Sequence, residues 1–411
     1  MIEVRRPRAT LALLLAAALL AACAPPDSAP ALTDLALPAA AGSLAPRLSA
    51  APDGALLASW LEPDGAGHAL RYARFADGRW SAAAVAARGD DWFVNWADTP
   101  GVFAHGGLLV AHWLRKSGAS PYAYDLLVSV SADGGASWGA PRPAHGDGLA
   151  AEHGFASWYP RGPEHGGGFG LVWLDGRAAG GGDHAAHDGH GGMMQIRHAW
   201  YDAAGAQQGE DLVDESTCDC CPTDLAVGAA GPLLVYRDRT AEELRDVYAT
   251  RLVDGAWTAP QVVHADGWRM PGCPVNGPAV EAVGARAAVA WFTAAGNAPQ
   301  VALAWSEDGG ASFGAPARID GGRPVGRVEL VLTEHEALVI WLEQGTGSSA
   351  ELRLRRAWLG GRLGANHLLG STAAARASGF PRAALAAGEV FLAWTDVGAD
   401  GARQVKVGRL D

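Results

Sequence analysis

The feature that most constrains this sequence is a pattern that recurs seven times. Each copy opens near a proline, passes through a glycine-containing turn and reaches an apolar segment that ends in an aromatic residue. The copies run from Pro46 to Trp60, Pro100 to Trp113, Pro160 to Trp173, Pro222 to Tyr236, Pro274 to Trp291, Val328 to Trp341 and Pro381 to Trp394. An alternating polar and apolar segment follows each aromatic residue. Units of roughly 40 to 60 residues with three or four short strands are typical of a β-propeller.

The composition agrees with an all-β fold that has many turns. Of the 411 residues, 55 are Gly and 24 are Pro, and only 18% are charged. The 16 Trp can bury a large core, which excludes intrinsic disorder, and no apolar run is long enough for a polytopic membrane protein. A net charge of -12 with only two lysines, Lys116 and Lys406, excludes the basic surface that nucleic acid requires.

The amino terminus has the pattern of a secretory signal. Three arginines precede an apolar stretch from Leu11 to Leu20, and two small residues follow it before Cys23. The quartet from Leu20 to Cys23 resembles the bacterial lipoprotein signal, in which the cysteine is lipidated and becomes the first mature residue. Because Ala24 rather than Asp follows the cysteine, the resemblance implies an outer-membrane lipoprotein that faces the periplasm or the cell surface. An ordinary cleaved signal with a chance cysteine is the alternative.

This interpretation divides the chain into three parts. Residues 1–22 form the signal peptide, residues 23–31 form a flexible tether rich in Pro and Ala, and residues 32–411 form a single propeller domain. The segment from Leu32 to Leu37 precedes the first repeat, and the last repeat stops after three strands. We therefore expect this early segment to supply the outer strand of the last blade and to close the ring.

Two turns carry a motif of their own. Ser131 to Trp138 and Ser306 to Phe313 both match Ser-x-Asp-x-Gly-x-x-Trp/Phe, the Asp box. The aspartate bonds to nearby amides, the glycine supplies a positive φ, and the aromatic fills the gap between strands, so the turn is a folding device. With these motifs the chain resembles the sialidase (BNR-repeat) superfamily of β-propellers over essentially its whole mature length. Sialidases have six blades; the repeat count here predicts seven, with six as the alternative.

The catalytic motifs of sialidases are not recognisable. In that family three arginines bind the substrate carboxylate, a tyrosine paired with a glutamate is the nucleophile, and an aspartate is the acid/base. The first arginine belongs to a Phe/Tyr-Arg-Ile-Pro signature, and here Leu44 takes its place. The family's nucleophile lies late in the chain, whereas the last tyrosine here is Tyr248. The sequence therefore favours a binding role, with an exo-α-sialidase-type glycosidase and a protein-interaction platform as alternatives.

Several arginines are expected at the channel mouth, on the face where the innermost strands begin. Those after the aligned prolines or in the loops after the second strands are Arg47, Arg161, Arg177, Arg237, Arg239 and Arg382. Because an arginine fork binds carboxylate or phosphate through two hydrogen bonds, these residues predict an anionic small molecule or glycan as ligand. The alternative is that they pair with local carboxylates such as Asp175 and Asp238.

The mature chain beyond Cys23 has four cysteines, and all of them fall in one region. They are Cys218, Cys220, Cys221 and Cys273. Cys221 and Cys273 both precede the aligned proline in neighbouring repeats, so the fold should place them side by side. An oxidising compartment favours disulfides, and Cys221 with Cys273 is the easiest pair to form. A soft-metal site made of thiols is the competing hypothesis.

A second cluster of ligand-type residues lies in the loop of the third repeat that projects from the same face. It contains His184, His187, His190, Met193 and Met194, including half of the four methionines. Thiolate, thioether and imidazole groups together suit copper, with zinc next. The alternative is a soluble Gly- and His-rich loop without a ligand.

Overall fold

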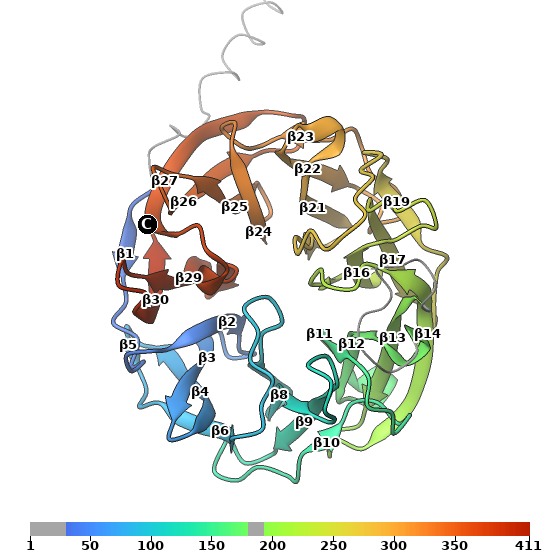
Figure 1. The fold of residues 1–411 in the computed structure, drawn as a ribbon, viewed down its shortest axis with the longest axis vertical. Helices are drawn as coiled ribbons and strands as arrows, with labels where there is room; N and C mark the ends of the chain where they lie inside the picture. The colour runs from blue at the N-terminus through green and yellow to red at the C-terminus, as the bar shows by residue number, and fades with distance from the viewer. Residues whose placement is uncertain (1–29, 180–192) are drawn as a thin grey trace, which may run out of the picture.

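Seven antiparallel sheets are arranged in a ring in the computed structural model, which describes residues 30–179 and 193–411 (Figure 1). Blade one has β2 (Leu44–Ala50), β3 (Leu56–Asp64), β4 (Gly67–Ala76), β5 (Arg79–Trp80) and β6 (Ala84–Gly89). Blade two has β7 (Gly101–His105), β8 (Leu108–Lys116), β9 (Tyr124–Ser131) and β10 (Arg142–Pro143). Blade three has β11 (His153–Pro160), β12 (Phe169–Asp175), β13 (Met194–Tyr201) and β14 (Gln207–Thr217).

The remaining blades follow the same order around the ring. Blade four has β15 (Asp224–Gly228), β16 (Gly231–Arg237), β17 (Val247–Val253), β18 (Ala256–Trp257) and β19 (Gln261–His264). Blade five has β20 (Ala279–Val283), β21 (Arg286–Thr293), β22 (Gln300–Ser306) and β23 (Ala317–Arg318). Blade six has β24 (Pro324–Leu332), β25 (Ala337–Gln344), β26 (Ser349–Ala357) and β27 (Leu363–Ala373). Blade seven has β28 (Arg382–Ala386), β29 (Glu389–Val397), β30 (Arg403–Leu410) and β1 (Leu32–Asp34).

Helical structure in the described ranges is confined to short 3₁₀ turns. They are η1 (Pro163–His165), η2 (Arg177–Ala179), η4 (Ala295–Asn297) and η5 (Arg376–Ser378). No helix among the described residues is long and apolar enough to cross a membrane.

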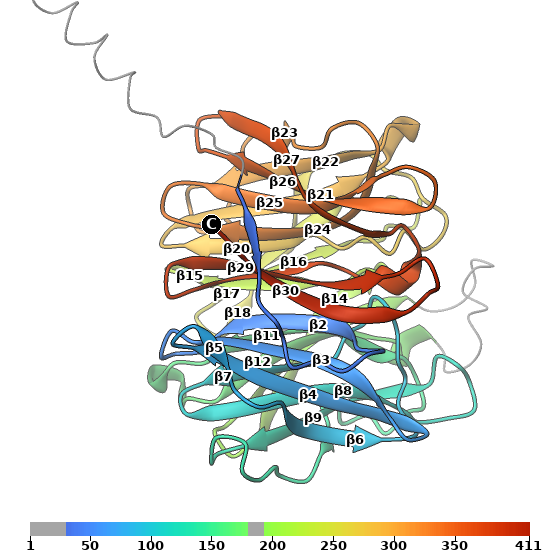
Figure 2. The same ribbon diagram turned by 90° about the vertical axis from the view of Figure 1, so that its left-hand side faces the viewer.

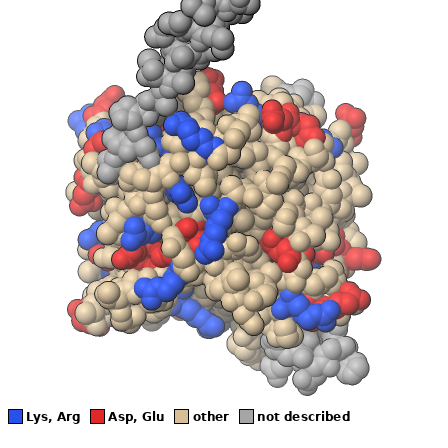
Figure 3. Space-filling model, turned by 90° about the horizontal axis from the view of Figure 1, so that it is seen from above, with Lys and Arg blue, Asp and Glu red and all other residues tan. Residues whose placement is uncertain are grey.

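The side of the ring seen in Figure 3 carries basic and acidic side chains interspersed with each other. The predicted all-β propeller with seven blades is confirmed, and the six-bladed alternative is wrong.

The ring is closed by the amino-terminal segment, as the incomplete last repeat predicts. Strand β1 pairs antiparallel with β30, with Leu32 opposite Leu410 and Asp34 opposite Gly408. In the edge-on view of Figure 2, this segment runs along the outer rim beside the C-terminal strands. The last blade therefore combines both ends of the described chain, which covers an edge that would otherwise be open to pairing.

The repeated aromatic residues lie in the second strand of each blade and anchor the packing between blades. Trp60, Trp173 and Trp341 have no exposed surface. Each donates its indole N–H to a carboxylate two residues later, at distances of 2.7 to 2.8 Å. A buried indole needs such a partner, because an unpaired N–H in the core costs free energy. The Trp-x-Asp/Glu pattern thus satisfies the polar atom of the anchor within the same strand.

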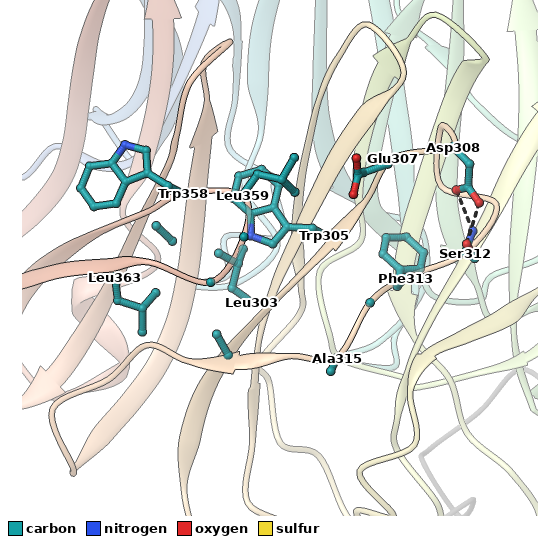
Figure 4. Close-up of a pocket in the computed structure, with 15 residues that line it drawn as sticks. Leu303, Trp305, Glu307, Asp308, Ser312, Phe313, Ala315, Trp358, Leu359 and Leu363 are labelled. Atoms are coloured by element: carbon teal, nitrogen blue, oxygen red, sulfur yellow. Dashed lines mark hydrogen bonds between the residues drawn. The ribbon is translucent and has the colours of Figure 1, made fainter. Parts of the chain in front are cut away.

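The two Asp boxes are local hydrogen-bonded turns, as predicted. Asp308 accepts hydrogen bonds from the Ser312 amide at 2.9 Å and from the Ser312 hydroxyl at 2.6 Å. Both residues line the pocket that is drawn in Figure 4. The Ser137 groups donate to Asp133 at the same distances. These bonds from Ser312 and Ser137 stabilise the carboxylates and hold the pKa of each aspartate at about 2.

The strand register identifies the residues that form one level of the innermost strands. In each blade, one residue of the first strand pairs with the second-strand residue that directly precedes the anchor aromatic. These first-strand residues are Arg47, Gly101, Ser157, Asp224, Ala279, Glu329 and Arg382. The expectation that Arg161 belongs to this level is wrong. Pro160 is the last residue of β11 rather than its first, so Arg161 lies in the hairpin at the opposite face.

Candidate metal centre

The four cysteines occupy two segments that lead into the innermost strands of neighbouring blades. Cys218, Cys220 and Cys221 lie between β14 and β15, and Cys273 lies between β19 and β20. The sulfur atoms of the first three all lie within 4.8 Å of one another, and the Cys218 and Cys221 sulfurs are 3.0 Å apart. The Cys220 thiol also interacts with that of Cys273. The structure therefore brings the four cysteines into one region, with Cys273 beside Cys220 and not beside Cys221.

The four cysteines differ in their exposure to solvent. Cys218 and Cys221 are buried, Cys220 is partly buried and Cys273 is exposed, and all four are free thiols. The contact that the structure shows for Cys221 is with Cys218 rather than with Cys273, which differs from the pairing expected to form most easily. The reason is the tight turn after β14, which folds Cys221 back onto Cys218 within the same segment.

The surroundings of Cys218 favour its ionised form. Burial opposes ionisation, but hydrogen bonds from the Cys220 and Cys221 thiols and the charge of Arg245 hold the pKa of Cys218 well below its usual range. Burial raises the pKa of the Cys221 thiol. The two neighbouring thiols and Arg245 thus stabilise a thiolate at Cys218.

Two of the predicted arginines, Arg237 and Arg239, hold the cysteine segment in place. Arg237 is buried and donates to the carbonyl oxygens of Asn276 at 2.9 Å, Phe292 at 2.7 Å and Arg245. Its own carbonyl accepts hydrogen bonds from the Cys218 amide at 3.0 Å and the Thr217 hydroxyl at 2.8 Å.

Arg239 binds two carboxylates, Asp219 at 3.1 Å and Glu243 at 2.7 Å. Asp219 lies inside the cysteine segment, so this ion pair fixes the segment to the loop after β16. Arg177 is saturated in the same way, by Asp175 at 2.7 Å, Glu210 at 2.8 Å and Asp147 at 3.1 Å. Arg177 and Arg239 therefore pair with nearby carboxylates, as the alternative to ligand binding predicts, whereas Arg237 binds backbone carbonyl oxygens.

Arg47 and Arg382 lie at the inner level of the ring among carboxyl groups. Arg47 donates to the Thr99 hydroxyl at 3.2 Å, and burial together with the nearby charge of Arg382 lowers the pKa of Arg47 to about 10. Arg382 is 3.4 Å from Glu329. Burial raises the pKa of Glu329 to about 7. The channel level therefore holds charges of both signs.

The histidine- and methionine-rich loop lies partly outside the described residues. His184, His187 and His190 lie outside the described residues, as does Cys23. Met193 is partly buried, and Met194 is buried at the start of β13, where it lies opposite Thr217. Because Thr217 directly precedes Cys218, the register places Met194 beside the cysteine segment. Met194 also packs in the apolar cluster that Cys220 joins.

A second group of ligand-type residues was missed by sequence reasoning. The rings of His145 and His153 stack in parallel, with centroids 3.5 Å apart and an interplanar angle of 2°. Asp147 binds both, at 2.7 Å and 3.1 Å. Imidazole lone pairs lie in the ring plane, so two parallel rings cannot direct them at one ion, and the group is a hydrogen-bonded network. The only sequence signal was the short His-x-Asp spacing before β11.

A tyrosine paired with a glutamate lies near this network. Tyr124 donates its hydroxyl proton to Glu152 at 2.7 Å. Asp98 lies near Tyr124, and burial raises the pKa of Asp98 to about 7. The tyrosine is only 1% exposed, and Phe93 stacks on its ring at 4.1 Å. Sequence reasoning looked for such a tyrosine late in the chain and so did not consider this one.

Comparisons with known proteins give matches in structure alone. No family model and no curated protein sequence matches the chain. The NanB sialidase from Streptococcus pneumoniae is 10% identical, with 97% of this chain and 96% of that chain covered and a TM-score of 0.45. A leech intramolecular trans-sialidase is 10% identical (90% and 67% covered, TM-score 0.46), and an α-L-arabinanase from Penicillium chrysogenum is 13% identical (93% and 98% covered, TM-score 0.45). The likeness to sialidase-type and arabinanase propellers concerns the fold alone.

Proposed function

We propose that this protein binds a thiophilic metal ion, copper(I) or zinc, through Cys218, Cys220 and Cys221. The observation that supports the proposal is the convergence of three sulfur atoms within 4.8 Å on a segment held by buried arginines. Thiolates are the ligands that copper(I) and zinc prefer. Cys273, which interacts with Cys220, and Met194, which lies beside the segment, are candidates for a further ligand.

The sulfur geometry requires a small adjustment on binding. Two sulfurs each about 2.3 Å from one tetrahedral zinc are separated by about 3.8 Å. Cys218 and Cys221 would therefore move apart from their present 3.0 Å. A rotation about the χ1 angle of either side chain provides such a change. The proposal thus needs side-chain movement and no rearrangement of the blades.

The test is a metal titration of the mature chain, purified without a histidine tag and reduced under inert gas. Copper(I) and zinc are added in competition with a coloured chelator, and we expect one equivalent to be retained per chain. The Cys218→Ser/Cys221→Ser variant should retain none, and Cys220→Ser should bind more weakly. Cys273→Ser tests whether this exposed residue supplies the further ligand, and it should weaken binding less than Cys220→Ser. Thermal unfolding of each variant shows whether the fold is kept, and full retention by a folded double variant would refute the proposal.

We further propose that the mature protein is anchored to the outer membrane by a lipid on Cys23. The support is the sequence pattern of residues 5–23, a basic segment, a short apolar stretch and a small-residue cleavage site. Mass spectrometry of the amino-terminal peptide should find a lipid-modified Cys23. The Cys23→Ser variant should move from the membrane fraction to the soluble fraction, and recovery of the wild-type protein in the soluble fraction would contradict the anchor.

A sialidase-type glycosidase is the second candidate function. It is favoured by the hydrogen bond between Tyr124 and Glu152 and by the neighbouring Asp98. Its weakness is the burial of Tyr124, since a nucleophile must reach its substrate. Release of a fluorophore from a sialyl substrate, abolished in Tyr124→Phe and kept in Tyr122→Phe, would establish this activity. Tyr122 is a suitable control because it is exposed.

A further inference from the structure

A cavity of about 780 Å³ lies on the face opposite the cysteines, between blades three and four. It is formed by the hairpins that join first to second strands and by the turns after the third strands. Residues that define its chemistry are His105, Tyr159, Arg161, His198, Trp200 and Leu252. Its volume falls in the range of about 300 to 1,000 Å³ that is usual for small-molecule sites.

Arg161 lines this cavity, and its positively charged guanidinium has no acidic partner among the described residues. Its backbone is fixed, because its amide donates to the Gly168 carbonyl at 3.1 Å and its carbonyl lies 3.2 Å from His105 Nε2. Its guanidinium makes no hydrogen bond or ion pair with any residue that the structure describes. Arg177 and Arg239, by contrast, are each held by two or more carboxylates. Arg161 is therefore available to an anion.

His198 supplies a buried polar atom that is also unpaired. The residue is 2% exposed, and its Nε2 is 2.8 Å from the Tyr159 hydroxyl. Its Nδ1 makes no hydrogen bond among the described residues, and the closest carboxylate oxygen, on Asp211, is 3.7 Å away. Burial and the charge of Arg161 lower the pKa of His198 to about 3, so the ring is neutral. When Tyr159 donates to Nε2, Nδ1 carries the proton and remains a donor without an acceptor.

The cavity has an aromatic wall with an apolar rim. Trp200 lines it and stacks on His198, with ring centroids 5.5 Å apart. Gly209 backs the indole so closely that a Cβ there would lie 2.2 Å from the ring, which fixes the position of Trp200. Val227 and Val253 on the rim are 44% and 36% exposed. A fixed aromatic face suits a flat, partly apolar ring.

We propose that this cavity binds a small carboxylate that carries a ring, with Arg161 binding the carboxylate and Trp200 packing against the ring. A guanidinium fork matches a carboxylate through two hydrogen bonds. His198 lines the cavity beside Arg161 and holds the Tyr159 hydroxyl in place. This site lies on the opposite face from the thiols and is independent of the proposed metal binding.

Calorimetric titration of the full mature chain tests the proposal. The probes are glucuronate, benzoate, glucose and inorganic phosphate. We expect at least one of the two ring carboxylates to bind with a dissociation constant of roughly a millimolar or tighter, and glucose to bind at least tenfold more weakly. Tighter binding of glucuronate would identify an acidic sugar as the ligand class, and tighter binding of benzoate an aromatic acid.

Variants separate the site from nonspecific binding. Arg161→Gln should weaken carboxylate binding by roughly tenfold or more, since a charge-assisted hydrogen bond is lost. Arg79→Gln, at the exposed first residue of β5 in blade one, should leave the affinity unchanged. Equal affinity in Arg161→Gln, or no binding of either ring carboxylate, would overturn the proposal. Phosphate binding as tight as that of the carboxylates would do so too, because the ring would then play no part.

Discussion

At the scale of single residues, the contacts of each arginine determine its role. Arg177 and Arg239 are saturated by carboxylates, and Arg237 is saturated by backbone carbonyls of blades four and five. Arg161 alone of the predicted set lies on the far face without a side-chain partner in the described residues. Residue type is therefore a poor guide to ligand binding in this protein, and the local acceptors decide.

The buried Arg237 should contribute strongly to stability. Arg237→Met would leave the carbonyl oxygens of Asn276, Arg245 and Phe292 without their donor. Each unsatisfied buried acceptor costs about 1 to 3 kcal/mol, so we expect the free energy of unfolding to fall by at least about 3 kcal/mol. Urea denaturation measures the change. The exposed Arg79→Met should alter stability by no more than about 0.5 kcal/mol, and a similar small change in Arg237→Met would contradict this account.

The channel carboxyl groups should make stability depend on pH. Burial and the charges of Asp224 and Glu329 raise the pKa of Glu281 to about 8, from an ordinary value of 4.5. The folded protein then binds this proton more tightly than the unfolded chain, so the stabilisation is complete below pH 4.5 and is lost as pH rises through about 8.

Glu281→Gln removes this titration. We expect the variant to gain about 1 to 2 kcal/mol over the wild type on raising the pH from 5 to 9, since part of the cost of the buried charge is screened by solvent in the channel. Urea denaturation at both pH values gives the difference. Glu307→Gln, at an exposed position, is the control, and a gain of equal size in that variant would assign the effect to net charge.

At the scale of elements, strand positions follow closely from the sequence, because each blade must bury an aromatic anchor and turn at glycine. The closing strand β1 and both Asp boxes lie where the repeat predicts them. The misplaced Arg161 shows the limit of this reasoning. The alignment assumed that the aligned proline, or Val328 in the sixth repeat, lies near the start of each innermost strand, but in blade three the proline ends β11. Only the hydrogen-bond register reveals such a shift, because proline is tolerated at either end of a strand.

Closure of the ring by β1 can be tested at one glycine. A Cβ at Gly408 would lie 2.6 Å from the Leu32 side chain, whereas a Cβ at Gly370 in β27 meets nothing within 4 Å. Gly408→Val should displace β1 and lower the free energy of unfolding by about 1 to 3 kcal/mol. Gly370→Val should cost much less. Hydrogen exchange should show faster exchange in β30 for the Gly408 variant alone, and equal behaviour of the two variants would argue against the closing role.

At the scale of the whole molecule, the propeller presents two separate groups of ligand-type residues on its two faces. The thiols converge on the face where innermost strands begin, and the Arg161 cavity lies on the other face. The sequence was sufficient to predict the fold and the approach of the cysteines, because both depend on the repeat. It left open whether the arginines bind a ligand or local carboxylates, and the structure shows that Arg177 and Arg239 bind carboxylates. It did not predict the stacked histidines, because their approach depends on the path of the loop before β11 and not on the repeat.

The central claim is that the cysteine cluster holds a metal ion, and X-ray absorption at the metal edge tests it most directly. Protein loaded with one equivalent of zinc or copper(I) should show about three sulfur neighbours at about 2.3 Å. The Cys218→Ser/Cys221→Ser variant should lose this sulfur shell. A first shell of nitrogen and oxygen alone in the loaded wild-type protein would contradict the account.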